Sequence, residues 1–265
     1  MVSSTDPQEL LHLARTIAVE AGTMATTMRT AGISVATTKS NQLDIVTQAD
    51  TAVENLIKER LKAARPDDGF LGEEGGEVEG SSGITWIVDP IDGTVNYLYG
   101  SSYYAVSIAA TMRGDDGGRI SIAACVYAPA LSAEYSAAVG HPAYLNGTEL
   151  HVNTNVPLDK ALVSTGFLYD VASRPTVLQD VTTLATKIRD VRMIGAAALE
   201  ICGVAEGRTD AHFQRGLPIW DYAAAILIAQ QAGAEVRGIV STVDRVERLL
   251  IANPELAATL DPLLA

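Results

Sequence analysis

The stretch from Trp86 to Tyr97 constrains the fold of this chain most, because it combines a buried-strand pattern with a carboxylate-bearing turn. Residues 84–88 are apolar and β-branched enough to form a strand. Pro90 lacks the N–H group that a hydrogen-bond ladder needs, so we expect Asp89 to lie at the C-terminal end of the strand. Open α/β sheets bind their ligands at that edge.

A second carboxylate and a turn of small residues follow Asp89. Asp92 lies three residues further on, and the backbone N–H groups of Gly93 and Thr94 can face an anion at the start of a helical turn. Such a turn beside two carboxylates suits a metal ion held between them and a phosphate. In the plainer interpretation Asp89 caps a strand and Asp92 opens a turn. Taken alone, this stretch favours neither interpretation.

The composition narrows the classes of protein. A chain of 265 residues with 48% hydrophobic and 19% charged residues can bury a full core. The net charge of −13 argues against a nucleic-acid surface, which needs clustered Lys and Arg. No run reaches the roughly 18 apolar residues of a membrane span, and the N-terminus lacks a signal-peptide pattern. We therefore expect a cytoplasmic protein without a membrane partner. Cys125 and Cys202 form no Cys-x-x-Cys pair and are expected to be buried free thiols.

The first half is expected to contain two helices and a mainly antiparallel sheet. One helix begins at Asp6-Pro7 and runs to about Met28, and another follows the capping box Thr47–Asp50. Residues 32–42 are expected to form a loop or loose hairpin, and residues 77–83 a surface loop. The expected strands are 70–71, 84–88, 103–112, 120–127, 133–139 and 143–145.

Strands and helices alternate in the second half. The expected strands are 162–165, 191–194, 209–213 and 249–252, and the expected helices are 177–188, 196–206, 222–231 and 254–264. The fold class is therefore α+β to α/β. No linker divides the chain, so we expect a single domain over 1–265 with halves of about 1–150 and 151–265.

Two adjacent glutamates framed by glycines, Gly72-Glu73-Glu74-Gly75-Gly76, are unusual. Glycine lets a backbone approach a ligand closely, although an acidic surface turn has the same composition. Like other acidic residues of this chain, Glu73 lies where an expected element starts or stops, and side chains at such positions reach a shared cleft. These acidic residues are Asp50, Glu73, Asp89, Asp92 and Asp221.

On these carboxylates and the residues beside them, the chain resembles the inositol monophosphatase family. The resemblance is carried, in order, by Lys39, 43–50, Gly72-Glu73-Glu74, 86–97, Gly195-Ala196-Ala197 and 220–224. It implies a layered α-β-α-β-α sandwich, a homodimer, and Mg²⁺-dependent hydrolysis of a small-molecule phosphate monoester, with inositol 1-phosphate expected as substrate. Inhibition by lithium is implied by the resemblance alone.

The resemblance also implies a role for each site residue. The metal ligands would be Glu73, Asp89, the carbonyl of Ile91, Asp92 and Asp221. The catalytic set would be Asp50, Glu73, Thr94 and Lys39, with Asp50 and Thr94 positioning the attacking water. The substrate would contact Asp92, Gly93, Thr94, Gly195, Ala196, Ala197, Gln214 and Asp221. An all-oxygen ligand set without His or Cys suits Mg²⁺.

Gln214 departs from the family pattern, which commonly has a glutamate there to contact substrate hydroxyls. This departure puts the substrate in more doubt than the chemistry, and leaves fructose 1,6-bisphosphate, histidinol phosphate and a 3′-phosphonucleotide as alternatives. A phosphatase with an aspartyl nucleophile would need Asp-x-Asp spacing, which Asp89 and Asp92 lack. A non-catalytic regulatory protein with a structural metal site is a rival from another class.

Overall fold

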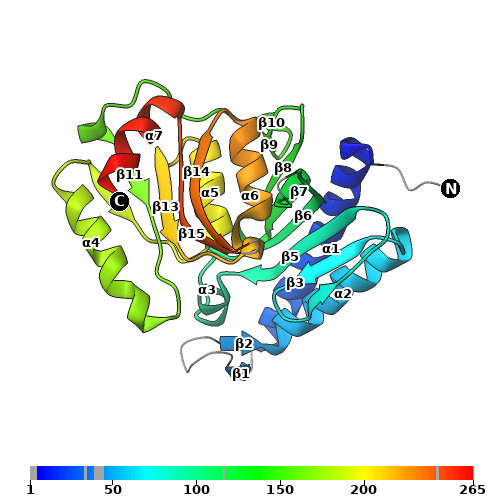
Figure 1. Ribbon diagram of the computed structural model, residues 1–265. Helices are drawn as coiled ribbons and strands as arrows, with labels where there is room; N and C mark the ends of the chain where they lie inside the picture. Colours follow the sequence, from blue (N-terminus) through cyan, green and yellow to red (C-terminus); the bar gives the residue numbers. More distant parts are fainter. Residues whose placement is uncertain (1–4, 33–34, 39–44, 116, 243–244, 265) are drawn as a thin grey trace.

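The computed structural model describes residues 5–32, 35–38, 45–115, 117–242 and 245–264, and for 35–38, 45–46, 239–242 and 245 it describes the backbone alone. These residues form five layers, helices alternating with two sheets (Figure 1). The expected α-β-α-β-α sandwich is confirmed.

The larger sheet has eight strands in the order β10-β9-β8-β7-β6-β5-β3-β4. All of its neighbouring strands are antiparallel except β3 and β5, which are parallel. Its strands are β3 (Gly69–Gly72), β4 (Gly76–Val78), β5 (Ile84–Asp92), β6 (Ala105–Arg113), β7 (Arg119–Ala128), β8 (Ala133–Ala138), β9 (Tyr144–Leu145) and β10 (Thr148–Glu149).

The smaller sheet has five strands in the order β12-β11-β13-β15-β14. β11 runs parallel to β12 and β13, whereas β15 is antiparallel to both of its neighbours. Its strands are β11 (Leu162–Ser164), β12 (Asp190–Arg192), β13 (Ala211–Arg215), β14 (Glu235–Thr242) and β15 (Arg245–Ala252). A separate antiparallel pair is formed by β1 (Val35–Thr38) and β2 (Ile45–Thr47). β1 lies within the segment expected to be a loop or loose hairpin, and β2 follows that segment.

Seven α-helices are present in the described residues: α1 (Pro7–Ala31), α2 (Gln48–Ala64), α3 (Thr94–Leu98), α4 (Arg174–Ala185), α5 (Ala197–Ala205), α6 (Ile219–Gln231) and α7 (Pro254–Leu260). Short 3-10 helices occur at Pro129–Leu131, Leu158–Lys160, Val171–Ser173 and Asp261–Leu263. None of the helices described has both the length and the apolar character of a membrane span.

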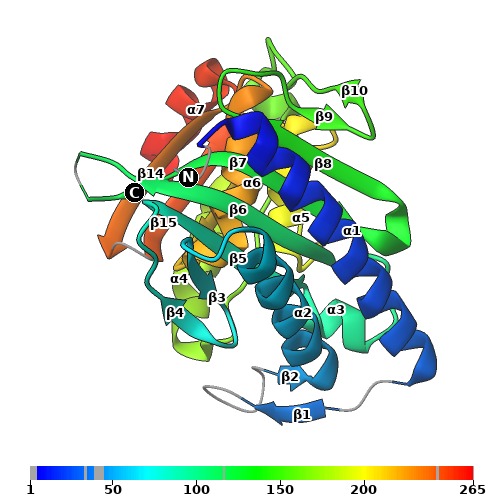
Figure 2. The same cartoon turned by 90° about the vertical axis from the view of Figure 1, so that its right-hand side faces the viewer.

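Three hydrophobic clusters hold the layers together. α1 and α2 cover the outer face of the larger sheet (Figure 2), where Ile17 and Ile57 share one cluster with Trp86. α5 and α6 lie between the two sheets, and their cluster takes side chains from both halves of the chain. The third cluster packs α4 and α7 against the smaller sheet. Cys125 and Cys202 are buried free thiols, as expected.

The starts of the first two helices follow from their sequences. Pro7 occupies the first turn of α1, and the carboxylate of Asp6 accepts a hydrogen bond from the N–H of Gln8 at 2.9 Å. α2 begins with the expected capping box, in which Thr47 and Asp50 bond each other's backbone N–H groups.

β5 continues beyond Asp89, where we expected it to end. The strand runs to Asp92, and its pairing with β6 is irregular between Asp89, opposite Ser107, and Asp92, opposite Ala105. A bulge leaves residues out of the ladder, so Pro90 can stay in the strand although it donates no hydrogen bond. The bulge therefore keeps both aspartates on one continuous element.

Several other boundaries differ from the sequence-based prediction. β4 begins at Gly76 and occupies part of the predicted 77–83 loop. β14 was not predicted, because it is a polar strand at the sheet's edge with Gly238 in its interior. α6 begins at Ile219 rather than Tyr222, since Pro218 is extended at its N-cap. Asp221 consequently lies in the first turn of α6.

The contact between Gly22 in α1 and Tyr127 in β7 generates a test of this packing. A Cβ atom at Gly22 would lie 2.6 Å from Tyr127 Cδ1, whereas one at Gly203, in α5, would meet nothing closer than 3.5 Å. Helix propensity alone makes Gly→Ala stabilising by up to about 1 kcal/mol. We expect Gly22→Ala instead to destabilise by about 1–3 kcal/mol through overpacking, and Gly203→Ala to be neutral or stabilising. Urea unfolding measures both; equal stabilisation would contradict the packing described.

Candidate active site

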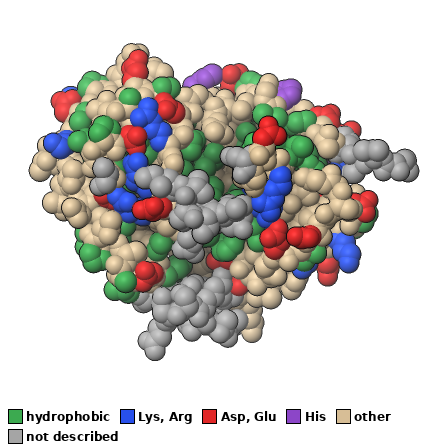
Figure 3. All heavy atoms as spheres, in the orientation of Figure 1, with side chains coloured by type: hydrophobic (Ala, Val, Ile, Leu, Met, Phe, Trp, Pro, Cys, Tyr) green, Lys and Arg blue, Asp and Glu red, His purple; other side chains and the backbone are tan. Residues whose placement is uncertain are grey.

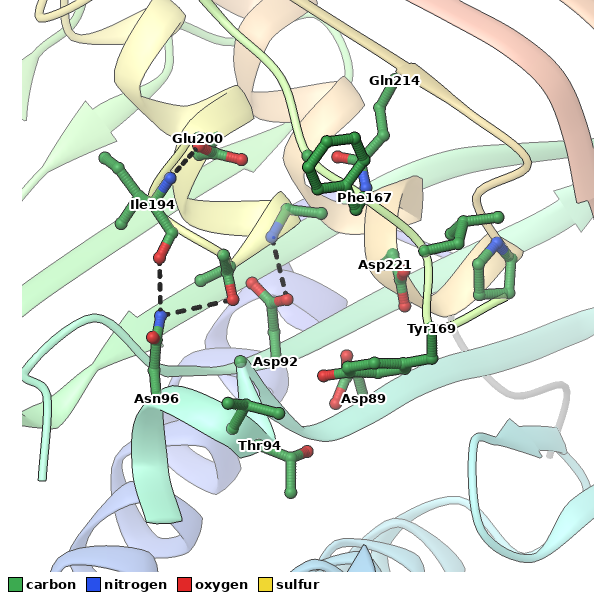
Figure 4. Close-up of a pocket in the computed structure, with 18 of the residues that line it drawn as sticks. Asp89, Asp92, Thr94, Asn96, Phe167, Tyr169, Ile194, Glu200, Gln214 and Asp221 are labelled. Carbon is green, nitrogen blue, oxygen red and sulfur yellow. Dashed lines mark hydrogen bonds between the residues drawn. The ribbon is translucent and has the colours of Figure 1, made fainter. Parts of the chain in front are cut away.

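A cavity of about 750 Å³ opens between the two sheets, beside the first turns of α5 and α6 (Figure 4). This volume lies within the roughly 300–1,000 Å³ of small-molecule sites. Its walls come from segments far apart in the chain: residues 73, 89, 91–96, 166–170, 193–197, 200, 214, 218, 220 and 221.

Most of the expected site residues meet at this cavity. The lining includes the expected ligands Glu73, Asp89, Ile91, Asp92 and Asp221, and the expected substrate contacts Gly93, Thr94, Gly195, Ala196, Ala197 and Gln214. One described residue of the expected set is not part of it. Asp50 lies behind Thr94 and does not line the cavity. Lys39 lies outside the described residues.

Asp89 is buried in the field of other carboxylates. Its side chain is 2% exposed, and one of its oxygens accepts the N–H of Ile91 at 3.0 Å. Burial raises the pKa of Asp89 well above its ordinary value, and repulsion from Glu73, Asp92 and Asp221 adds to the rise. Four carboxylates that repel one another in a buried place make a strong site for a positive charge.

Asp92 caps α5 from across the cavity. Its two carboxylate oxygens accept the N–H groups of Ala197 at 3.0 Å and Ala198 at 2.9 Å. Burial raises the pKa of Asp92 to about 7, although these amides oppose the rise. A carboxylate oxygen has two lone pairs, so Asp92 keeps acceptor capacity toward the cavity. The amide of Ala197, in contrast, is engaged by Asp92.

Asp50 is both a helix cap and a partner of Thr94. Its Oδ2 accepts the N–H of Thr47 at 2.8 Å, and its Oδ1 lies 3.1 Å from Thr94 Oγ1. Thr94 Oγ1 is also 3.1 Å from the carbonyl oxygen of Ile91. Because a hydroxyl carries one proton, Thr94 can donate to only one of these acceptors at a time. Asp50 reaches the cavity only through Thr94.

The residues present fit a hard divalent cation by their chemistry. The lining carboxylates and the carbonyl of Ile91 are oxygen donors of the kind that Mg²⁺ prefers. Within the part of the chain that is described, however, no three Asp, Glu, His or Cys side chains are arranged as a ready-made metal site. Binding a cation would therefore require side chains to draw together, and the mutual repulsion at Asp89 is the force that a cation would relieve.

The described lining contains no Lys or Arg. It carries six acidic side chains, Glu73, Asp89, Asp92, Asp170, Glu200 and Asp221. Outside the cavity, Arg215, Arg237 and Arg248 each contact an acidic partner. On the face drawn in Figure 3 basic side chains likewise lie next to acidic ones. The cavity wall described is thus a strongly acidic place.

Glu200 is a cavity residue that sequence reasoning missed. It is 2% exposed, and its Oε1 accepts the N–H of Ile194 at 2.6 Å. Asn96 Nδ2 donates to the carbonyl of the same residue at 2.8 Å, so Ile194 is held from both sides (Figure 4). Burial raises the pKa of Glu200 to about 8. An acid on an otherwise apolar helix, four residues after the Gly195-Ala196 pair, was the available signal.

Tyr169 is the other prominent side chain in the cavity. Figure 4 shows its ring beside Asp89. Burial and the nearby carboxylates, Glu73 foremost, raise the pKa of its hydroxyl. Phe167 lines the cavity as well. Arg192 is not in the lining and pairs with Asp190.

Gln214 closes one end of the cavity. It is 5% exposed, and its Oε1 accepts no hydrogen bond from the described residues. Two residues before it in β13, His212 is fully buried and outside the cavity lining. Burial lowers the pKa of His212 to about 3. That imidazole is therefore neutral.

Fold and site together define a layered α/β protein with an acidic small-molecule cavity between its sheets. Comparison with known proteins gives the family. The model of the inositol monophosphatase family matches residues 6–265. Inositol-1-monophosphatase of Mycobacterium bovis is 41% identical over 249 residues, covering 87% of this chain and 84% of that protein.

Two further relatives broaden the comparison. The Nus factor SuhB of Xylella fastidiosa is 37% identical over 199 residues, covering 75% of this chain and 70% of that protein. The crystal structure of the extragenic suppressor protein suhB from Bartonella henselae has a TM-score of 0.88 at 31% identity, covering 97% of this chain and 98% of that one. The chain belongs to the inositol monophosphatase family and is a phosphatase that hydrolyses phosphate monoesters.

The raised pKa of Glu200 makes stability depend on pH. Its pKa near 8 in the fold exceeds the ordinary value of 4.5, so between these values the folded state binds the extra proton, and stability falls as pH rises. The slope contributed is at most about 1.4 kcal/mol per pH unit. Glu200→Gln mimics the protonated acid and should remove this contribution.

We therefore expect Glu200→Gln to gain stability relative to wild type between pH 5.5 and pH 8, measured by urea unfolding with chelator present. Glu79→Gln, the same change at an exposed loop residue, is the control and should leave the pH dependence as it is. Parallel pH profiles for wild type and Glu200→Gln would show that Glu200 titrates normally.

Proposed function

We propose that this phosphatase uses Mg²⁺ and acts on myo-inositol 1-phosphate or a close polyol monophosphate. One observation carries the proposal: six acidic side chains and no Lys or Arg line the described cavity. A phosphate dianion would be repelled from such a wall unless a cation came with it. The general metal dependence of the family and the names of its relatives support this interpretation.

The carboxylates Glu73, Asp89, Asp92 and Asp221 and the carbonyl of Ile91 would hold Mg²⁺. When bound, Mg²⁺ supplies charge neutralisation at the phosphate and a lowered pKa for the attacking water. In this proposal Glu73 is one of the catalytic residues because it would bind the metal ion. Asp92 and Asp221 would in addition contact the substrate.

Thr94 orients the water in this proposal. If its hydroxyl donates to Asp50 Oδ1, the lone pairs of Thr94 Oγ1 are free to accept a hydrogen bond from a water in the cavity. Asp50 thereby acts as a positioning residue, because it does not touch the cavity itself. Lys39, outside the described residues, would stand near the phosphate as the family resemblance implies.

Small backbone groups and an amide would bind the rest of the substrate. Gly93 has φ of 86°, and a Cβ there would meet the carbonyl of Tyr103 at 2.9 Å, so only glycine suits this turn. The N–H groups of Gly93 and Thr94 would face the phosphate. Gly195, Ala196 and Ala197 would border the polyol, and Gln214 Oε1, which lacks a partner among the described residues, would accept a substrate hydroxyl.

The residues after the Gly93-Thr94 pair favour the polyol. Relatives that act on 3′-phosphonucleotides or histidinol phosphate often carry lysine there, whereas this chain has Val95-Asn96-Tyr97. The Nδ2 of Asn96 donates to the carbonyl of Ile194 and so is engaged by the cavity wall itself. We extend the proposal to a single-domain homodimer in the cytoplasm, which the family resemblance supports.

A substrate panel tests the proposal. We expect kcat/KM with Mg²⁺ to be highest for myo-inositol 1-phosphate, with fructose 1,6-bisphosphate second, and Asp89→Asn to abolish turnover while exposed Asp159→Asn does not. A tenfold preference for histidinol phosphate or a 3′-phosphonucleotide, about 1.4 kcal/mol in transition-state binding, would overturn the substrate. Absence of Mg²⁺-stimulated turnover for every ester would overturn the proposed use of Mg²⁺.

The contact between Asp50 and Thr94 can be tested separately from helix capping. Thr94→Ala and Asp50→Asn should lower kcat far more than they raise KM, because orienting water matters mainly in the transition state. Thr47→Ala removes the cap but leaves the Asp50 to Thr94 contact, so it should cost about 1 kcal/mol of stability with a much smaller loss of kcat. If Asp50→Asn lost as much stability and as little kcat as Thr47→Ala, the role of Asp50 would be limited to capping the helix.

A further inference from the structure

Glu54, on α2, is buried against the turn that carries Glu73. The turn comprises residues 73–75 and joins β3 to β4, with Gly72 and Gly76 paired at its base. Glu54 is 3% exposed, and its Oε2 accepts the N–H of Glu74 at 2.8 Å. The backbone N–H of Gly75 also faces this carboxylate, and its attraction opposes the rise in the pKa of Glu54 that burial causes.

The N–H groups at the start of this turn are therefore bound. That of Glu73 donates to the carbonyl of Val88 in β5 at 3.2 Å, and that of Glu74 donates to Glu54, which the N–H of Gly75 also faces. The backbone is fixed on one side by β5, the strand that carries Asp89, and on the other by α2. The side chain of Glu73 is left to face the cavity.

The glycines of this segment make room for that carboxylate. A Cβ at Gly75 would lie 2.6 Å from Glu54 Oε1, and one at Gly72 would lie 2.6 Å from Glu54 Cδ. From the sequence we interpreted these glycines as places where a ligand approaches the backbone. In the structure the group that approaches is Glu54. Neither Gly72 nor Gly75 has a positive φ, so space rather than backbone conformation requires glycine here.

α2 also carries Asp50, one helical turn before Glu54. Residues four apart lie on the same helix face, so one face of α2 reaches both Thr94 and the 73–75 turn. We propose that Glu54 is a positioning residue that fixes the 73–75 turn, and through it sets where the Glu73 carboxylate can bind the cation. This inference rests on the proposed function in that it takes Glu73 as a cation ligand.

The chemistry of the contact predicts which substitution is informative. A carboxylate offers only acceptors, and the turn offers two donors. Gln at position 54 has the same shape but presents an NH₂ group to one of these N–H groups. Outer residues that orient ligands typically change metal affinity by about 10- to 100-fold when replaced.

The test measures Mg²⁺ binding directly by titration calorimetry and follows hydrogen exchange of the amides of residues 73–75 in metal-free protein. We expect Glu54→Gln to weaken Mg²⁺ binding at least tenfold and to speed exchange at Glu74 and Gly75. At saturating Mg²⁺, kcat should fall by less than the affinity does. Glu59→Gln makes the same change at an exposed position of α2 and should alter none of these quantities.

Gly75→Ala gives a second route, because it displaces the Glu54 carboxylate without removing it. It should also weaken Mg²⁺ binding. The double variant with Glu54→Ala should lose no more Mg²⁺ affinity than the single variant with the larger loss. Wild-type Mg²⁺ affinity and exchange in both Glu54→Gln and Gly75→Ala would overturn the inference and leave the proposed function standing. Failure of wild type to bind Mg²⁺ would overturn the proposed function and the inference with it.

Discussion

The hydrogen bonds from the amides of Ala197 and Ala198 to Asp92 join the two halves of the chain at the cavity. Asp92 is the last residue of β5, in the first half of the chain, and α5 belongs to the second half. A buried carboxylate is costly unless it is hydrogen-bonded, and the free N–H groups at the start of a helix need acceptors. The helix start in the second half gives the buried carboxylate its hydrogen-bond donors, and the carboxylate gives the helix start its acceptor. The distance between the two walls of the cavity depends on this contact.

The residues that line the cavity were more predictable than the bounds of the elements. Asp89, Asp92 and Asp221 were expected at a shared cleft because acidic side chains at strand ends and helix starts are visible in the sequence, and because their order matches a family; all three line the cavity. The end of β5 and the start of α6 were predicted wrongly, since both depend on Pro90 and Pro218, whose effect is decided by a bulge and a cap. Local pattern shows that a proline interrupts an element, but not how the surrounding structure accommodates it.

The backbone partners of two buried acids were not predictable. Glu54 and Glu200 lie on amphipathic or apolar helices; Glu54 accepts an N–H group 20 residues further along the chain, and Glu200 accepts one that the turn before α5 brings near. Asp50 was left with two alternatives, cap or catalytic partner, and the structure shows that its two oxygens make the two contacts separately. The glycines beside Glu73 were noticed, but their reason lay in α2, about twenty residues earlier in the chain.

The bulge at Pro90 also bears on how the chain reaches its fold. A slip of one residue between β5 and β6 would turn Asp89 to the opposite face of the sheet, against the α1 and α2 cluster, and bury a charge in hydrocarbon. Pro90 opposes this slip because moving it into the regular ladder would remove a hydrogen bond that the strand needs. The residue that interrupts the ladder thus protects the nascent sheet from a misregistered, aggregation-prone pairing.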